Sequence, residues 1–163
     1  GYLADSVGAN AALARATDEI NRQQASRLAG HLIHRLTPDS TVGILGLSYK
    51  PDTNVIEQSQ GLALAKELIS QGFSVVLYDP LALENARQIL GDAPDYADSA
   101  VSCVQKADAV VITTSSDDFK KLEPADFKSA TSSSRKLLLD CWRILDRDQF
   151  ALVCEYLALG VGS

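Results

Sequence analysis

Four short apolar runs alternate with segments of helical periodicity, and this alternation constrains the fold more than any other feature of the sequence. Runs of a few residues that are apolar on both faces are typical of strands buried in a parallel sheet. Their alternation with helices predicts an α/β fold, namely a Rossmann-like doubly wound, mostly parallel sheet. The predicted strands are 41–47, 74–78, 109–113 and 136–139, with a last strand at 152–157.

Helices are predicted between these strands, and the helix over 59–71 has the clearest boundaries. Ser59 stands where an N-cap hydroxyl accepts a hydrogen bond from a first-turn amide. Gly72 stands where helices commonly end with glycine. The other predicted helices are 81–90, 98–105 and a short one near 119–127.

A long helical segment precedes the alternating region. Leu28, Leu32 and Leu36 recur every four residues and therefore share one helical face. We expect one long helix, or two helices broken near Gly8, and its small apolar residues suit close packing against another helix. The sequence thus divides into a helical segment, 1–36, and a Rossmann-like domain, 37–163.

The composition is that of one soluble domain with a substantial core, since 46% of the 163 residues are apolar and 22% are charged. A formal net charge of -6 argues against a nucleic-acid partner, because such proteins gather lysine and arginine on one face. No apolar run approaches the roughly 20 residues of a membrane helix, and no signal segment opens the chain. We therefore expect a cytoplasmic protein with no membrane partner.

The cysteines and histidines do not predict a disulfide framework or a metal site. Cys103, Cys141 and Cys154 are an odd number without paired-ligand spacing, so reduced and mostly buried thiols are expected. His31 and His34 share a helical face but lack a third ligand nearby, which favours a solvated helix surface over metal binding.

The segment VGILGLSYKPDT, residues 42–53, combines a buried strand, a small-residue turn and one lysine. In a doubly wound sheet such a turn lies at the carboxyl end of a strand, where phosphates bind. The glycine pattern GxGxxG is incomplete, so a dinucleotide turn is doubtful. Lys50 is either a phosphate partner or a solvated loop lysine. Asp79 is either a ribose-binding acid or simply the end of a strand.

The motifs GLSYKPDT, EQSQ and LAKELISQGFSVVLYDP resemble the C-terminal domain of the UDP-glucose/GDP-mannose dehydrogenase family, and looser likeness continues through KADAVVITTSSDDF and LLLDCWRILD. The resemblance implies that Tyr49 and Lys50 contact a UDP-sugar. It also implies that Asp52 and Thr53 shape the loop and that Ser59 caps the next helix. No catalytic, cofactor-binding or metal-binding residue is implied for this chain, because its cysteines do not match the family's catalytic motif.

Two departures from the family pattern affect the expected site. Glu57 and Gln58 stand where many members have arginine and glutamate, and an acid there would repel the pyrophosphate of NAD. Trp142 replaces the arginine expected after the fourth strand, with Arg143 one position later. Adjacent residues on an extended segment point to opposite sides, so Arg143 does not simply replace that arginine. Trp142 either stacks on a base or packs.

The resemblance implies that the intact protein is an NAD-dependent UDP-sugar 6-dehydrogenase, in which an N-terminal domain binds NAD and a central helical region forms a homodimer. This chain is then its UDP-sugar-binding domain, inactive alone and not expected to bind NAD, with its own NAD domain as partner. Two alternatives remain open. One is a non-catalytic nucleotide- or cofactor-binding regulatory module, and the other is an assembly domain that dimerises through residues 1–36.

Overall fold

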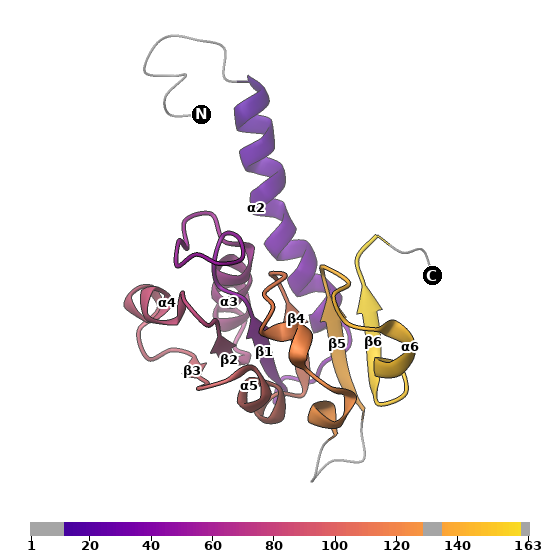
Figure 1. The fold of residues 1–163 in the computed structure, drawn as a ribbon. Coiled ribbons are helices and arrows are strands. Elements are labelled where there is room, and N and C mark those ends of the chain that lie inside the picture. The colour runs from indigo at the N-terminus through magenta and orange to yellow at the C-terminus, as the bar shows by residue number, and fades with distance from the viewer. Residues whose placement is uncertain (1–11, 129–134, 161–163) are drawn as a thin grey trace.

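The computed structural model describes residues 12–128 and 135–160 and confirms the predicted α/β architecture (Figure 1). The possible helix break near Gly8 lies outside the described residues. In chain order the elements are α2 (Ala12–Ile33), β1 (Thr41–Leu45), α3 (Gln60–Ser70), β2 (Ser74–Tyr78), α4 (Leu83–Leu90), β3 (Asp95–Tyr96), α5 (Ala100–Lys106), β4 (Ala109–Ile112), the 3₁₀ turns η1 (Phe119–Lys121) and η2 (Pro124–Phe127), β5 (Lys136–Asp140), α6 (Arg147–Phe150) and β6 (Cys154–Ala158).

The six strands form one sheet in the order β3-β2-β1-β4-β5-β6, and every neighbouring pair is parallel. From β1 the chain moves outward to β2 and β3, then crosses back to place β4 on the other side of β1. This order is that of the dinucleotide-binding doubly wound fold, and its reversal between β1 and β4 creates the crevice in which such sheets bind ligands.

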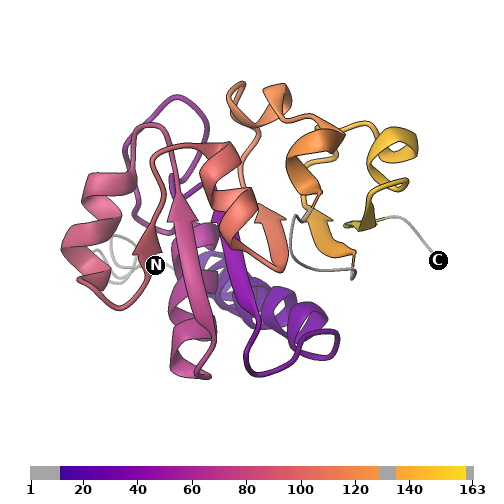
Figure 2. The ribbon, with the colours of Figure 1, turned by 90° about the horizontal axis from the view of Figure 1, so that it is seen from below.

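Helices cover both faces of the sheet and bury two apolar layers (Figure 2). Helices α2, α3 and α4 pack on the face that includes Val42 and Ile44 of β1. Helix α5, the two 3₁₀ turns and α6 pack on the face that includes Leu45. Burial on both faces explains why the strands read as continuous apolar runs rather than as alternating ones.

Helix α2 packs on the sheet only through its second half. Leu28, Ala29 and Leu32 are buried, while Leu36, just beyond the helix, is half-buried. The first half projects beyond the domain, on the side of the carboxyl ends of the strands (Figure 1), and Ile20 in this half is 56% exposed. The predicted apolar face therefore packs against the rest of the domain only from about residue 25 onward.

The boundaries of α3 are confirmed, since Ser59 Oγ accepts a 3.2 Å hydrogen bond from the Leu62 amide and Gly72 has a φ of 87°. The first strand is shorter than predicted, because Gly46, with a φ of 105°, turns the chain after Leu45. The sequence did not predict β3, which has two residues, or α6, which is a single turn capped by Asp146. The helix expected near 119–127 is two 3₁₀ turns.

Candidate functional site

Two loops at the carboxyl edge of the sheet carry all four residues predicted to bind substrate. The lysine loop, residues 46–59, joins β1 to α3 and contains Tyr49 and Lys50. The tryptophan loop, residues 140–146, follows β5 and contains Trp142 and Arg143. Strand β4 lies between β1 and β5, so the two loops emerge on either side of its end.

Asp79 fixes the beginning of the lysine loop. Its Oδ2 accepts hydrogen bonds from the amides of Leu47 and Ser48, at 2.7 and 3.1 Å. Its Oδ1 accepts from the amides of Leu81 and Ala82, at 2.9 and 2.8 Å. The side chain is only 3% exposed, and both oxygens are occupied by backbone donors. Asp79 therefore does not fit the role of a ribose-binding acid.

Gly61 allows the start of α3 to approach the end of β1. A Cβ atom at Gly61 would lie 2.0 Å from the Gly46 carbonyl oxygen and 2.7 Å from the Thr113 hydroxyl. In a dinucleotide fingerprint the third glycine permits this close packing of helix and strand. Here the packing glycine is present but is displaced along the sequence, because the lysine loop is inserted before the helix. The pattern GxGxxG is incomplete in this sequence because that pattern assumes a short turn between strand and helix.

The exposed tip of the lysine loop is closed by backbone and side-chain hydrogen bonds. The Tyr49 amide donates to the Val55 carbonyl at 2.7 Å, and the Val55 amide donates to Thr53 Oγ1 at 3.2 Å. The Asn85 side chain of α4 donates to the Asn54 carbonyl at 2.8 Å. Thr53 thus shapes the loop, as the family resemblance implied. The side chains of Tyr49, at 58% exposure, and of Lys50 are left facing solvent.

Thr113, at the end of β4, links the two loops. Its hydroxyl donates to the Gly46 carbonyl at 2.6 Å, which holds the start of the lysine loop. Its own carbonyl accepts a 2.7 Å hydrogen bond from the indole N–H of Trp142. The sequence around Thr113 predicts only the end of a strand, because nothing in it indicates either partner.

The tryptophan loop is organised around the buried carboxylate of Asp140. Its oxygens accept from the amides of Trp142 and Leu145, at 3.1 and 3.0 Å, and from the Tyr156 hydroxyl at 3.0 Å. Burial, followed by the charge of Asp140 and this hydrogen bond, raises the pKa of Tyr156. Tyr156 therefore remains a hydrogen-bond donor to Asp140 well above neutral pH.

The backbone at Arg143 is left-handed, with a φ of 55°, rather than extended. The expectation that Trp142 and Arg143 point to opposite sides rested on an extended segment, and that premise is wrong. In the described part of the chain the other non-glycine residues with positive φ are Asp52 and Gln58, both in the lysine loop. Such conformations cost about 1–3 kcal/mol each and are concentrated at functional sites.

The two basic side chains of these loops are available to an anionic ligand. Lys50 and Arg143 are exposed, and neither has a hydrogen-bond or ion-pair partner among residues 12–128 and 135–160. Trp142 is 53% exposed although its N–H is satisfied internally. The two loops therefore offer two cations without partners in the described residues and one hydrogen-bonded aromatic ring. These groups lie at the edge of the sheet where the strand order reverses between β1 and β4.

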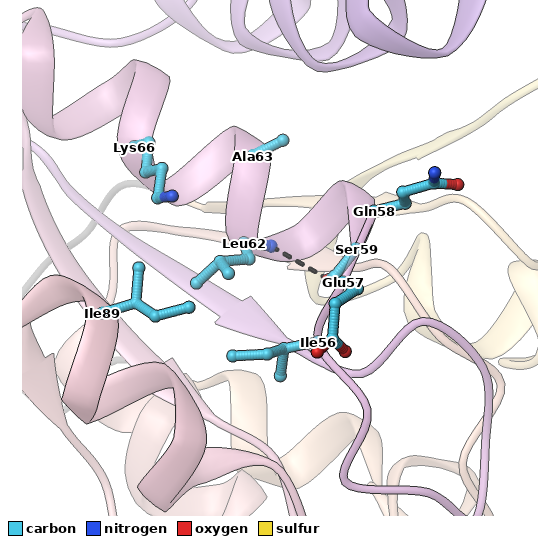
Figure 3. A pocket seen from close by; sticks show the side chains of 8 residues that line it. All are labelled: Ile56, Glu57, Gln58, Ser59, Leu62, Ala63, Lys66 and Ile89. Carbon is cyan, nitrogen blue, oxygen red and sulfur yellow. Dashed lines mark hydrogen bonds between the residues drawn. The ribbon is translucent and has the colours of Figure 1, made fainter. Parts of the chain in front are cut away.

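A pocket of about 340 Å³ lies next to the lysine loop, between α3 and α4 (Figure 3). Ile56, Leu62 and Ile89 point into it, and the exposed Glu57 and Lys66 lie at its border. None of the four predicted substrate residues lines this pocket. Glu57 thus borders a pocket that none of these four residues lines.

The three cysteines are free thiols, of which Cys103 and Cys154 are buried and Cys141 is half-buried. Burial raises the pKa of Cys103 and of Cys141 to about 12 and that of Cys154 to about 11. Protonated thiols are poor nucleophiles, because the thiolate is the reactive form. In the parts of the chain that the structure describes, no three His, Cys, Asp or Glu side chains are grouped to hold a metal ion. Among the same residues, no helix is both long and apolar enough to cross a membrane.

Two known proteins are similar to this chain in sequence. UDP-glucose 6-dehydrogenase AglM of Haloferax volcanii is 35% identical over 136 residues, which are 83% of this chain and 30% of that protein. UDP-glucose 6-dehydrogenase YwqF of Bacillus subtilis is 27% identical over 161 residues, which are 98% of this chain and 35% of that protein. The chain therefore spans about a third of the length of these relatives.

Solved structures share the fold. A UDP-glucose dehydrogenase from the archaeon Pyrobaculum islandicum matches 98% of this chain and 34% of its own, with a TM-score of 0.69 and 24% identity. GDP-mannose dehydrogenase from Pseudomonas aeruginosa matches 88% of this chain and 33% of its own, with a TM-score of 0.62 and 21% identity. The model of the UDP-glucose/GDP-mannose dehydrogenase family, UDP binding domain, matches residues 43–147. The chain thus belongs to the UDP-glucose/GDP-mannose dehydrogenase family and represents its C-terminal UDP-binding domain.

Proposed function

We propose that this domain binds the nucleotide end of a UDP-sugar at the carboxyl edge of its sheet, between the lysine loop and the tryptophan loop. The observation that carries the proposal is the pair of unpartnered cations, Lys50 and Arg143, in two loops that Thr113 joins. An ammonium and a guanidinium are the side chains that bind phosphate oxygens best. The net charge of the chain is negative, so the binding of an anion depends on individual basic side chains such as these.

Each residue of the site has a distinct role in this proposal. Lys50 neutralises the pyrophosphate, and Arg143 adds a second contact from the opposite loop. Trp142 and Tyr49 offer exposed aromatic rings against which the uracil or the sugar packs. The left-handed backbone at Arg143 supports a contact from this residue, because the side chains of Trp142 and Arg143 need not point to opposite sides as they would on an extended segment.

For the intact protein we propose an NAD-dependent oxidation of a UDP-sugar at C6, with NAD and the catalytic cysteine supplied by chain outside this domain. The names of the relatives support this activity, since they are UDP-glucose 6-dehydrogenases. Binding energy from the nucleotide, remote from the reacting carbon, would orient the sugar for that step. The domain alone is expected to be inactive, because its three thiols remain protonated at neutral pH.

Titration with UDP tests the binding site directly. Trp142 is the only tryptophan of the chain, so its fluorescence reports a ligand that reaches the tryptophan loop. Lys50→Ala is expected to weaken UDP binding about tenfold, through loss of one charged hydrogen bond. Lys106→Ala is the matched control, because Lys106 is an exposed lysine at the end of α5, near the amino edge of the sheet. Equal affinities of the wild type and Lys50→Ala would remove Lys50 from the site.

We also propose that two copies of the intact protein associate through α2. Its first half projects from the domain, so its surface is open to a second helix (Figure 1). Analytical ultracentrifugation of the chain with and without residues 1–24 tests this proposal. The same number of subunits in both forms would exclude α2 as the contact.

A further inference from the structure

We propose that Asp79 is a positioning residue for UDP binding, because its carboxylate holds the lysine loop and α4 together as one unit. The inference rests on the proposed function, since it concerns the loop that carries Lys50. It assigns to Asp79 a role different from the ribose contact that its place after a strand suggests. Asp79 does not touch the ligand in this proposal and acts through the loop.

The bonds of Asp79 connect two elements that are far apart in the sequence. One oxygen binds the amides of Leu47 and Ser48, which are the second and third residues of the lysine loop. The other binds the amides of Leu81 and Ala82, which lead into α4. Because both oxygens are used and the side chain is 3% exposed, the carboxylate fixes the distance between the loop and the helix.

A second contact ties the same helix to the far end of the loop tip. Asn85, in α4, donates to the carbonyl of Asn54 at 2.8 Å. Lys50 lies between these two attachments, two residues after Ser48 and four residues before Asn54. The lysine is exposed and its backbone is held from both sides, which is the arrangement expected of a preorganised cation.

Asparagine at position 79 would preserve the shape of the side chain but not its hydrogen bonding. An amide has a single acceptor oxygen, and its NH₂ group would face backbone N–H donors on the other side. Either the lysine loop or the start of α4 therefore loses its acceptor. Buried amides without acceptors are unfavourable, so the segment that loses them is expected to move.

The experiment measures UDP affinity by calorimetry on the 163-residue chain with Asp79→Asn, Lys50→Ala and the double variant. Asp79→Asn is expected to weaken UDP binding about tenfold, which is the loss expected from a displaced charged contact. In the Lys50→Ala background the same change should alter affinity less than about twofold, because the effect passes through Lys50. Asp108→Asn is the matched control, since Asp108 accepts from the Thr41 amide at the opposite edge of the sheet.

Amide hydrogen exchange provides a second measurement that does not require UDP binding, and its wild-type part does not depend on the folding of any variant. In the wild type the Leu47 and Ser48 amides should exchange as slowly as those of β1, and in Asp79→Asn they should exchange faster while the amide of Ile44 does not. Fast exchange of Leu47 and Ser48 in the wild type would overturn the proposal.

Wild-type UDP affinity in folded Asp79→Asn would also overturn it. The same is true if Asp79→Asn lowers UDP affinity equally in the wild-type and Lys50→Ala backgrounds. If the wild type binds no UDP, the proposed function fails, and the exchange pattern still decides whether Asp79 positions the loop.

Discussion

The indole N–H of Trp142 donates a 2.7 Å hydrogen bond to the backbone carbonyl of Thr113. This bond satisfies the polar group of the side chain internally, although 53% of the residue is exposed. A tryptophan that only packed would bury its ring, whereas here the bond fixes the ring while much of its surface remains open. The ring is therefore open to a ligand, as the proposed site requires.

Trp142→Phe should weaken UDP binding by about 1 kcal/mol, because a phenyl ring retains a stacking face but loses the bond that orients it. Calorimetry is the appropriate measurement, since the variant has no tryptophan fluorescence. Tyr96→Phe is the control, because it removes a similar bond, from the Tyr96 hydroxyl to the Gly91 carbonyl, at the far edge of the sheet. Equal affinities for Trp142→Phe and the wild type would indicate that the indole does not contact the ligand.

The salt dependence of UDP binding should reveal the exposed cations of the site. Lys50 and Arg143 face solvent, so their attraction for a pyrophosphate is screened as the ionic strength rises. The affinity of the wild type should fall steadily from low to high salt, and that of Lys50→Ala should fall less steeply. Parallel salt curves for the two proteins would contradict a direct contact between Lys50 and the pyrophosphate.

Local sequence signals predicted the elements but not the contacts that join them. The limits of β2 and the cap of α3 follow from neighbouring residues, and both are confirmed. The bonds of Thr113 to Gly46 and to Trp142 connect distant parts of the chain, so no local pattern indicates them. The family resemblance named the lysine loop but not the buried carboxylate that holds it.

Alkaline pH should destabilise the domain. Burial raises the pKa of the Cys103 thiol from about 9 to about 12, so the native state keeps this proton while the unfolded chain loses it above about pH 9. The free energy of unfolding is therefore unaffected below pH 9 and falls between about pH 9 and 12, by about 1.4 kcal/mol per pH unit for this buried thiol. The raised pKa of Tyr78, about 12 through burial and the neighbouring Asp118, acts in the same direction from pH 10.

Urea denaturation at several pH values measures this slope, and Cys103→Ala should make it shallower. The variant also loses packing contacts, since the thiol is fully buried. This loss of packing lowers the free energy of unfolding by the same amount at every pH and does not change the slope. An unchanged pH slope in Cys103→Ala would show that the thiol keeps an ordinary pKa in the native state.

Gly61→Ala should destabilise the domain by about 3 kcal/mol, because the structure cannot hold a methyl group at this position without moving α3. The added Cβ would lie 2.0 Å from the Gly46 carbonyl oxygen, which is backbone and cannot turn aside. Gly30→Ala is the matched control, since a Cβ there meets nothing within 4 Å and alanine favours the helix by about 0.5–1 kcal/mol. Urea denaturation should therefore show opposite shifts for the two substitutions.

A displaced α3 also moves the end of the lysine loop, so folded Gly61→Ala should bind UDP more weakly than the wild type, whereas Gly30→Ala should bind it equally. Wild-type stability of Gly61→Ala would contradict the close approach of α3 to β1.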